Sequence, residues 1–363
     1  MAIAFDQKRW DDVKETSRRW WAGELERPLI QIRLHGRDPG RPEPDTPSHG
    51  FYSFYHPDVT AGQIVDRADY SLSRVEYLGD AFPTVWPNFG PGVLAAFLGA
   101  HLENGEGTVW FRPDQEREVD ELRFDLDPAN EWLERVASIL QAGAERWEGL
   151  VQLGMTDLGG SVDVLSTFRP SAQLLLDLYD APAAVKERTW ELHELWFAVQ
   201  GHLDRVARPV NPGYTSWTPL FSEGSSYMLQ CDFCFMIGPD MFEEFVRPEL
   251  EASCRRLANP FYHLDGPGEL PHLSSLLAIE ELKGVQWVPG SGAAGITEWP
   301  EVYRQIRDAG KLIQIFGGQS EKNWRALDVL AEQLGDARGV CLIADAPLSE
   351  RDEVMEFLGR HGL

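Results

Sequence analysis

The last third of the chain contains four short apolar runs at nearly even spacing: FYHL at 261–264, VQWV at 285–288, LIQIF at 312–316 and VCLIA at 340–344. Each run is rich in residues that favour β-structure, and helical hydrophobic spacing occupies the intervals between them. Strands that are apolar on both faces and alternate with helices are typical of a parallel sheet covered by helices on both sides. The sequence therefore predicts an α/β fold.

The same alternation extends back toward the N-terminus. Further strands are predicted at 28–34, 81–86, 150–156 and 225–231. Helical spacing covers 60–78, and 106–124 is predicted to be an irregular segment or a hairpin. Eight strands, each followed by a helix, favour a single closed (β/α)8 TIM barrel over an open doubly wound sheet. Residues 1–27, with tryptophans at helical spacing, are expected to form an N-terminal helical extension, and residues 28–363 the barrel.

The composition excludes several classes of partner. The 363 residues include 58 Asp and Glu against 33 Lys and Arg, a formal net charge of −25 at pH 7. This charge repels phosphate backbones and anionic lipid, so we expect neither nucleic acid nor a membrane surface as a partner. Four cysteines are too few for a disulfide framework at this length. The start of the chain does not resemble a signal peptide and no run approaches about 18 apolar residues, which predicts a soluble cytoplasmic protein.

Polar and aromatic residues close to the predicted strand ends are the candidates for chemistry, because barrel enzymes place their sites at the C-terminal ends of the strands. The candidate substrate-binding residues are Arg33, Arg37, Asn88, Asp157, Trp217, Gln230, Gln286 and Trp287. The candidate catalytic residues are Asp232, His263, Asp265 and Asp345.

The His263-Leu264-Asp265 segment is the most specific of these features. Residues two apart on a strand point the same way, so the imidazole and the carboxylate can address one metal ion or one substrate group. A local hydrogen bond that shapes the following turn is the alternative. Asp232 is a charged residue inside an apolar run, and whether it faces the site stays open.

Two other features have plain structural alternatives. Cys231 and Cys234 have metal-knuckle spacing, but Cys254 and Cys341 do not form a second pair, so buried unreactive thiols are favoured. The arginines after the first strand can clamp a carboxylate or form surface ion pairs. Tryptophans near strand ends can stack on a substrate or belong to the core, and the glycines after Asp157 suit either ligand approach or helix packing.

Several segments together resemble a known superfamily. Residues 231–233 and 237–248, CDF and IGPDMFEEFVRP, look like the motif "SPEMFxEFVxP" that opens the helix after a strand. Residues 261–266 resemble a strand ending in His-x-Cys-Gly, and 28–37 match the spacing Pro-x-x-x-x-Arg-x-x-Gly-Arg. These are motifs of the uroporphyrinogen decarboxylase and corrinoid methyltransferase superfamily, and the resemblance spans most of the chain. It implies a (β/α)8 barrel and a homodimer.

Departures from the decarboxylase branch count against its reaction. That branch uses an aspartate after its second strand, where this chain has Asn88. Its serine before the "SP" motif falls on Asp232, and its late Gly-His-Gly corresponds to residues 345–347, Asp-Ala-Pro. A tetrapyrrole with many carboxylates would also meet a strongly acidic protein. Decarboxylation of uroporphyrinogen itself is therefore not expected.

The methyltransferase branch is the better match. It binds zinc through His-x-Cys and a later cysteine, positions that correspond here to His263, Asp265 and either Asp345 or Cys341. In terms of hard and soft ligands, this donor set is harder than His/Cys/Cys. It still accepts zinc, and it suits a substrate that binds through oxygen better than a thiol. The resemblance thus implies methyl transfer or demethylation of a small molecule, with a corrinoid carried by a partner protein as the methyl carrier of that branch.

Two alternatives stay open at this point. One is decarboxylation of a small carboxylic acid without a cofactor, in which Arg33 and Arg37 grip the carboxylate and an acid supplies the proton. The other is a barrel that binds a ligand without catalysis. For either enzyme we expect His263 and Asp265 to line the largest polar pocket, with Asp232 and one of the arginines on its wall. Clustered carboxyl groups there, Asp157 and Asp345 included, should raise one another's pKa values unless a cation compensates.

Overall fold

The structure, a computed structural model, describes residues 3–317 and 322–363. Its strands are β1 Leu29–His35, β2 Val75–Gly79, β3 Thr84–Val85, β4 His101–Asn104, β5 Val109–Arg112, β6 Gln152–Leu153, β7 Ser226–Leu229, β8 Asn259–Asp265, β9 Gly284–Val288, β10 Leu312–Phe316 and β11 Val340–Pro347. Its α-helices are α1 Gln7–Trp21, α2 Ala61–Ser73, α3 Leu94–Phe97, α4 Glu131–Trp147, α5 Ser161–Phe168, α6 Ser171–Asp180, α7 Pro182–Ala207, α8 Pro239–Phe245, α9 Arg247–Arg256, α10 Leu273–Leu277, α11 Pro300–Asp308, α12 Ala326–Leu334 and α13 Arg351–Arg360.

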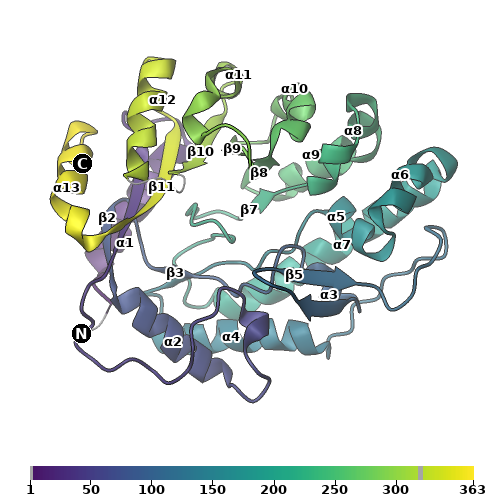
Figure 1. Cartoon of the computed structure of the whole chain (residues 1–363), viewed down its shortest axis with the longest axis horizontal. Helices are drawn as coiled ribbons and strands as arrows, with labels where there is room; N and C mark the ends of the chain where they lie inside the picture. Colours follow the sequence, from purple (N-terminus) through teal and green to yellow (C-terminus); the bar gives the residue numbers. More distant parts are fainter. Residues whose placement is uncertain (1–2, 318–321) are drawn as a thin grey trace.

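A mainly parallel sheet forms the centre of the molecule (Figure 1). Its strand order is β2-β1-β11-β10-β9-β8-β7, and every neighbouring pair is parallel except β1 with β2. From β7 to β11 the strands follow in chain order with helices between them, which confirms the predicted α/β class. The short strands β3 and β6 form a separate parallel pair, and β4 and β5 an antiparallel hairpin. Within the described residues the main sheet ends at β2 and β7, so closure into a barrel stays a prediction.

Each of the eight predicted strands overlaps a strand of the structure, but two are much shorter than predicted. The strands expected at 81–86 and 150–156 are reduced to β3 and β6, two residues each. Pro83 in the first of them, and Pro87 directly after it, lack the N–H that a longer ladder needs. The predicted hairpin is β4 with β5, slightly earlier than the interval 106–124.

The helix expected over 60–78 is wrong in its last turn. Helix α2 ends at Ser73, and residues 75–79 form β2, antiparallel to β1. The local sequence VEYLG places β-branched and aromatic residues where pairing with β1 buries them, and this tertiary contact outweighs the helical spacing. Gly79 ends the strand with a φ of +61°, and the next residue donates its N–H to the Ile30 carbonyl at 2.7 Å.

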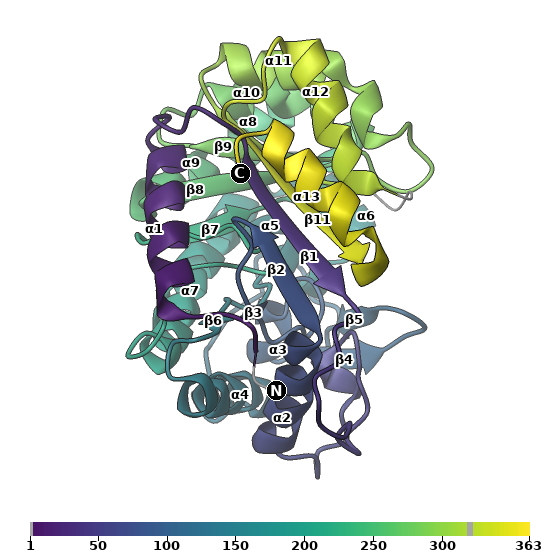
Figure 2. The ribbon, with the colours of Figure 1, turned by 90° about the vertical axis from the view of Figure 1, so that its left-hand side faces the viewer.

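The two faces of β1 divide the core from the site. Ile30, Ile32 and Leu34 belong to the main hydrophobic core, in which helices cover the sheet. On the other face, Leu29 packs in a second cluster with Trp20 from α1, which lies beside the sheet in Figure 2. Polar side chains follow toward the carboxyl ends of the strands. None of the helices in the described residues combines the length and apolar character needed to cross a bilayer.

Candidate metal centre

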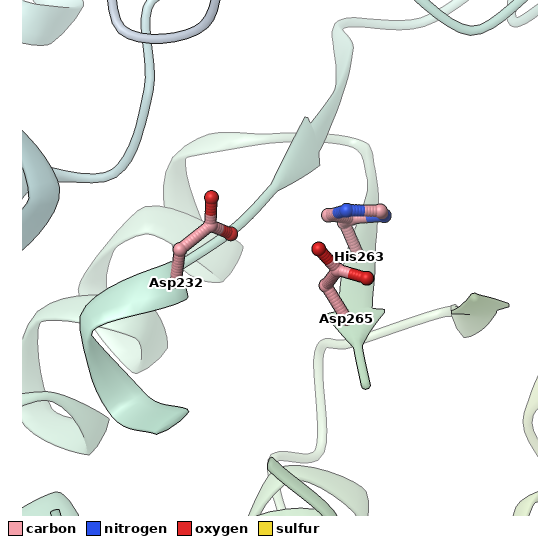
Figure 3. A group of neighbouring side chains, drawn as sticks. All are labelled: Asp232, His263 and Asp265. Carbon is pink, nitrogen blue, oxygen red and sulfur yellow. The ribbon is translucent and has the colours of Figure 1, made fainter. Parts of the chain in front are cut away.

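Three side chains with metal-binding atoms meet at the carboxyl ends of β7 and β8. Asp232 begins a short 3-10 helix, Asp232–Met236, directly after β7, and His263 and Asp265 lie two apart on β8. One donor atom from each residue lies within 4.8 Å of the other two. Figure 3 shows the three side chains pointing toward one another. The pairing of β7 with β8 explains this, because it places Leu229 opposite Tyr262. Asp232 follows Leu229 by three residues, and Asp265 follows Tyr262 by three residues, so the two carboxylates lie at the same edge of the sheet. Among the described residues the three form a candidate metal site.

Asp163 holds the backbone that carries Asp232. Its carboxylate accepts hydrogen bonds from the backbone N–H groups of Asp232, at 3.1 Å, and Phe233, at 2.8 Å. Asp163 lies in the first turn of α5, where a carboxylate is favoured by the helix dipole. The sequence analysis missed this residue. The available signal in the sequence was an acidic residue at the third position of the helix that follows Asp157-Leu-Gly-Gly.

His263 is held by neighbours on two sides. Its Nδ1 is hydrogen-bonded to Oε1 of Gln286 on the adjacent strand β9. The Trp217 ring lies edge-on to the imidazole with 5.2 Å between ring centroids. Gln286 was expected to contact substrate, but its side chain is fully buried and is bonded to His263 instead.

Carboxyl groups crowd this edge of the sheet. Burial, together with the charge of Asp232, raises the pKa of Asp157 to about 7 and that of Asp163 to about 8. Burial and the nearby charges of Asp232 and Asp163 raise the pKa of Glu269 to about 10. Asp232 is open to solvent on one side, yet burial and the charge of Asp265 raise its pKa as well. For Asp157 this agrees with the expectation from sequence, and a bound cation would relieve the repulsion among the carboxyl groups.

Asp345 lies apart from these three residues in an ion-pair cluster of its own. It is opposite Arg33 in the pairing of β11 with β1. Its carboxylate accepts from Arg33 Nε at 2.8 Å and Nη2 at 2.7 Å, and it contacts His35 Nε2 at 2.7 Å. Burial alone would raise the pKa of Asp345, but His35 and Arg33 outweigh it and lower the pKa. Asp345 is therefore not one of the clustered donors, contrary to expectation.

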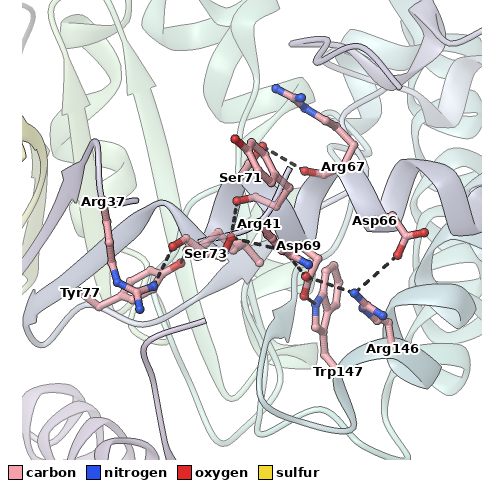
Figure 4. Close-up of polar contacts among 12 residues, drawn as sticks. Arg37, Arg41, Asp66, Arg67, Asp69, Ser71, Ser73, Tyr77, Arg146 and Trp147 are labelled. Atoms are coloured by element: carbon pink, nitrogen blue, oxygen red, sulfur yellow. Dashed lines mark hydrogen bonds and ion pairs between the residues drawn. The ribbon is translucent and has the colours of Figure 1, made fainter. Parts of the chain in front are cut away.

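Arg37 and Asn88 hold loops together. The Arg37 guanidinium donates from Nη1 to the Ser73 carbonyl at 2.7 Å, at the end of α2, and lies beside Tyr77 (Figure 4). Asn88 donates from Nδ2 to the Gly50 carbonyl at 2.8 Å. Among the described residues, Arg33 is bonded to Asp345 and Arg37 to the Ser73 carbonyl, and a joint clamp on one carboxylate stays a prediction.

The remaining predicted residues divide between the site and the core. Gln230 is buried, and its Oε1 has no hydrogen-bond partner within the described part of the chain; the same holds for Trp217 Nε1. Trp287 corrects the prediction of substrate contact. Its side chain is fully buried in the main core and packs against Trp299 at 5.1 Å between ring centroids, so no face is open to a ligand.

The cysteines are buried free thiols, as the sequence favoured. Cys231, Cys234 and Cys341 are each at most 2% exposed, and burial raises the pKa of all three thiols. Cys341 lies in the second core cluster, below the strand ends. It is therefore not available as the late ligand that the superfamily pattern offers.

Arg33 also lines a cavity of about 270 Å³ together with His35, Tyr52, Tyr77 and residues of α2. A single pocket that includes His263 and Asp265 along with this arginine stays a prediction.

Comparison with known proteins supports the fold. No protein-family model matches the chain, and no curated protein matches it. Among solved structures it is similar to a methyltransferase from Methanosarcina mazei, with a TM-score of 0.58 and 13% sequence identity. The match covers 94% of this chain and 99% of the other. At this identity the likeness shows a shared fold, and the chemistry has to be argued from the site.

Proposed function

We propose that the protein is a methyl-transfer enzyme whose site holds a divalent metal ion, most simply zinc, between Asp232, His263 and Asp265. The observation that carries the proposal is the convergence of three donor atoms within 4.8 Å of one another. It is supported by the resemblance of His263-Leu-Asp265 to a zinc-binding His-x-Cys segment. The fold shared with a methyltransferase adds to this support.

The donor set fits such an ion. One imidazole nitrogen and two carboxylate oxygens are ordinary zinc ligands, and three protein ligands leave a position open for a substrate. The nearby carboxyl groups have raised pKa values, and a bound cation would stabilise their ionised forms. Replacement of thiolate by carboxylate ligands makes the site harder, which favours a substrate that binds through oxygen.

The chain's own residues orient this chemistry. When bound, the metal would act as a Lewis acid and lower the pKa of a hydroxyl or thiol group of the substrate. Asp163 keeps the Asp232 loop in place through its two backbone hydrogen bonds. Trp217 packs against the His263 ring and limits its rotation. Asp232 is exposed, so the ion that it would bind is accessible to a substrate from solvent.

The second reactant in this proposal is a methyl carrier. The superfamily resemblance favours a corrinoid bound to a separate partner protein, which would deliver or remove the methyl group. The substrate is then a small molecule with an oxygen or sulfur atom that gains or loses a methyl group.

The decarboxylase alternative has less support. It needs two arginines on one carboxylate, whereas Arg33 is engaged with Asp345 and Arg37 with the Ser73 carbonyl. A solved structure that shares the fold is also that of a methyltransferase.

Methyl transfer can be tested with methylcobalamin as a surrogate donor. Zinc-loaded protein is mixed anaerobically with methylcobalamin and either phenol or 2-mercaptoethanol, and the cobalt absorption is followed; the reverse reaction uses cob(I)alamin and anisole. We expect transfer above the protein-free rate, lost in Asp265→Ala and kept in the matched variant Asp345→Ala. Rates equal to the protein-free rate in both directions would contradict the proposal.

A further inference from the structure

A chain of side-chain amides lies next to the candidate metal centre. His263 Nδ1 contacts Oε1 of Gln286, and Nε2 of Gln286 donates to Oε1 of Gln314. The three residues come from three adjacent parallel strands, β8, β9 and β10. Backbone pairing places His263 opposite Gln286 and Gln286 opposite Gln314. The register of the sheet therefore sets this amide chain.

Both glutamines are fully buried. Water has no access to their amide groups, so it cannot replace a lost hydrogen-bond partner. The hydrogen bonds within the amide chain therefore determine which nitrogen of the imidazole carries the proton. In this arrangement Gln286 uses its N–H on Gln314 and presents its carbonyl oxygen to His263. A carbonyl oxygen only accepts, so this arrangement corresponds to a ring proton on Nδ1 of His263.

We infer that Gln286 is a positioning residue that keeps His263 in the Nδ1–H tautomer, with Gln314 fixing the orientation of the Gln286 amide. The neutral ring then has a single lone pair, on Nε2, for a ligand. A metal-bound histidine commonly donates its second N–H to a fixed acceptor, which orients the ring and raises its basicity. The inference deepens the proposed function and rests on it only for the metal. The tautomer itself is a property of the metal-free protein.

The first test measures the tautomer directly. Metal-free protein labelled with 15N-histidine is examined at pH 8 by long-range 1H–15N correlation NMR. The His263 signals are assigned by their absence in His263→Gln. We expect a protonated Nδ1 and an unprotonated Nε2 in the wild type. In Gln286→Leu the acceptor is gone, and we expect a shift toward the Nε2–H form that free imidazole side chains prefer. An Nε2–H tautomer in the wild type would overturn the inference.

The second test measures zinc affinity by chelator competition. Loss of the acceptor in Gln286→Leu should weaken zinc binding about 10- to 100-fold. Gln286→Glu should bind zinc close to the wild-type level, because the carboxylate still accepts from Nδ1. Gln314 Nε2, which is buried without a partner in the described structure, can turn to donate to that carboxylate.

Gln31→Leu is the matched control. Gln31 is also buried in the sheet, but its amide donates to the Pro219 carbonyl at 2.8 Å and does not belong to the amide chain. Equal losses of zinc affinity in Gln31→Leu and Gln286→Leu, or failure of Gln286→Glu to restore affinity, would show a merely structural role and overturn the inference. A wild type that binds no zinc would instead refute the proposed function, and the NMR measurement would still decide the tautomer.

Discussion

Asp157 should make the metal-free protein less stable as the pH rises, and Asp157→Asn should remove that dependence. The carboxyl is buried, its Oδ1 accepts from the Gly159 N–H at 2.9 Å, and burial with the charge of Asp232 raises its pKa to about 7. A carboxyl with a raised pKa holds its proton in the folded state after the unfolded chain has lost it. Stability therefore falls between about pH 4 and pH 7 and stays low above that range.

The size of the effect follows from the same pKa. A rise from 3.8 to about 7, at about 1.4 kcal/mol per pKa unit, sets an upper limit of about 4 kcal/mol. Asparagine keeps the oxygen that accepts from Gly159 and carries no charge. We expect Asp157→Asn to match the wild type near pH 4 and to exceed it by about 2 to 4 kcal/mol at pH 8.

Urea unfolding in EDTA at a series of pH values measures this difference. Asp58→Asn, at a side chain that is 92% exposed, is the control and should shift stability little at any pH. A difference between Asp157→Asn and the wild type that is the same at pH 4 and pH 8 would refute the reasoning.

Three further predictions concern stability and access. Asp69, buried between α2 and α4, accepts hydrogen bonds from an indole and two arginines (Figure 4). Burial would raise its pKa, but these donors lower it, so Asp69→Asn should cost about 3 kcal/mol at pH 7. Urea unfolding should show a smaller cost at pH 3, where the unfolded chain takes up the proton more readily than the folded one. Gly284→Ala places a Cβ 2.2 Å from the Phe261 ring and should cost about 1 to 3 kcal/mol, whereas Gly238→Ala, with no atom within 4 Å, should be close to neutral in the same denaturation assay. The four buried cysteines should resist a thiol reagent at pH 8 until the protein unfolds, and rapid modification of a native thiol would contradict their burial.

The sequence was sufficient for features that depend on local pattern. Apolar runs at even spacing predicted the parallel strands, and the i, i+2 placement of His263 and Asp265 predicted that both face one site. Asp232 stood out as a charge inside an apolar run, and the structure brings it to the same edge. These inferences needed only the period of a strand and the cost of burying a charge.

The features that were missed depend on strand register and on contacts between distant segments. Gln286 and Trp287 are neighbours on one strand and necessarily face opposite sides, so both could not line a site; the phase of β9 decides which one does. The bond between Arg33 and Asp345 joins residues 312 positions apart through the pairing of β1 with β11. Asp163 acts through backbone N–H groups, which leave no trace in a side-chain motif.

Zinc binding tests the proposed centre most directly. Metal-free protein is titrated with zinc by calorimetry, and the bound metal is counted by mass spectrometry after desalting. We predict one zinc ion per chain, lost in His263→Ala and Asp265→Ala and retained in Asp345→Ala, which removes a carboxylate at another strand end. Absence of zinc binding in the wild type, or binding that survives both His263→Ala and Asp265→Ala, would contradict a metal centre at Asp232, His263 and Asp265.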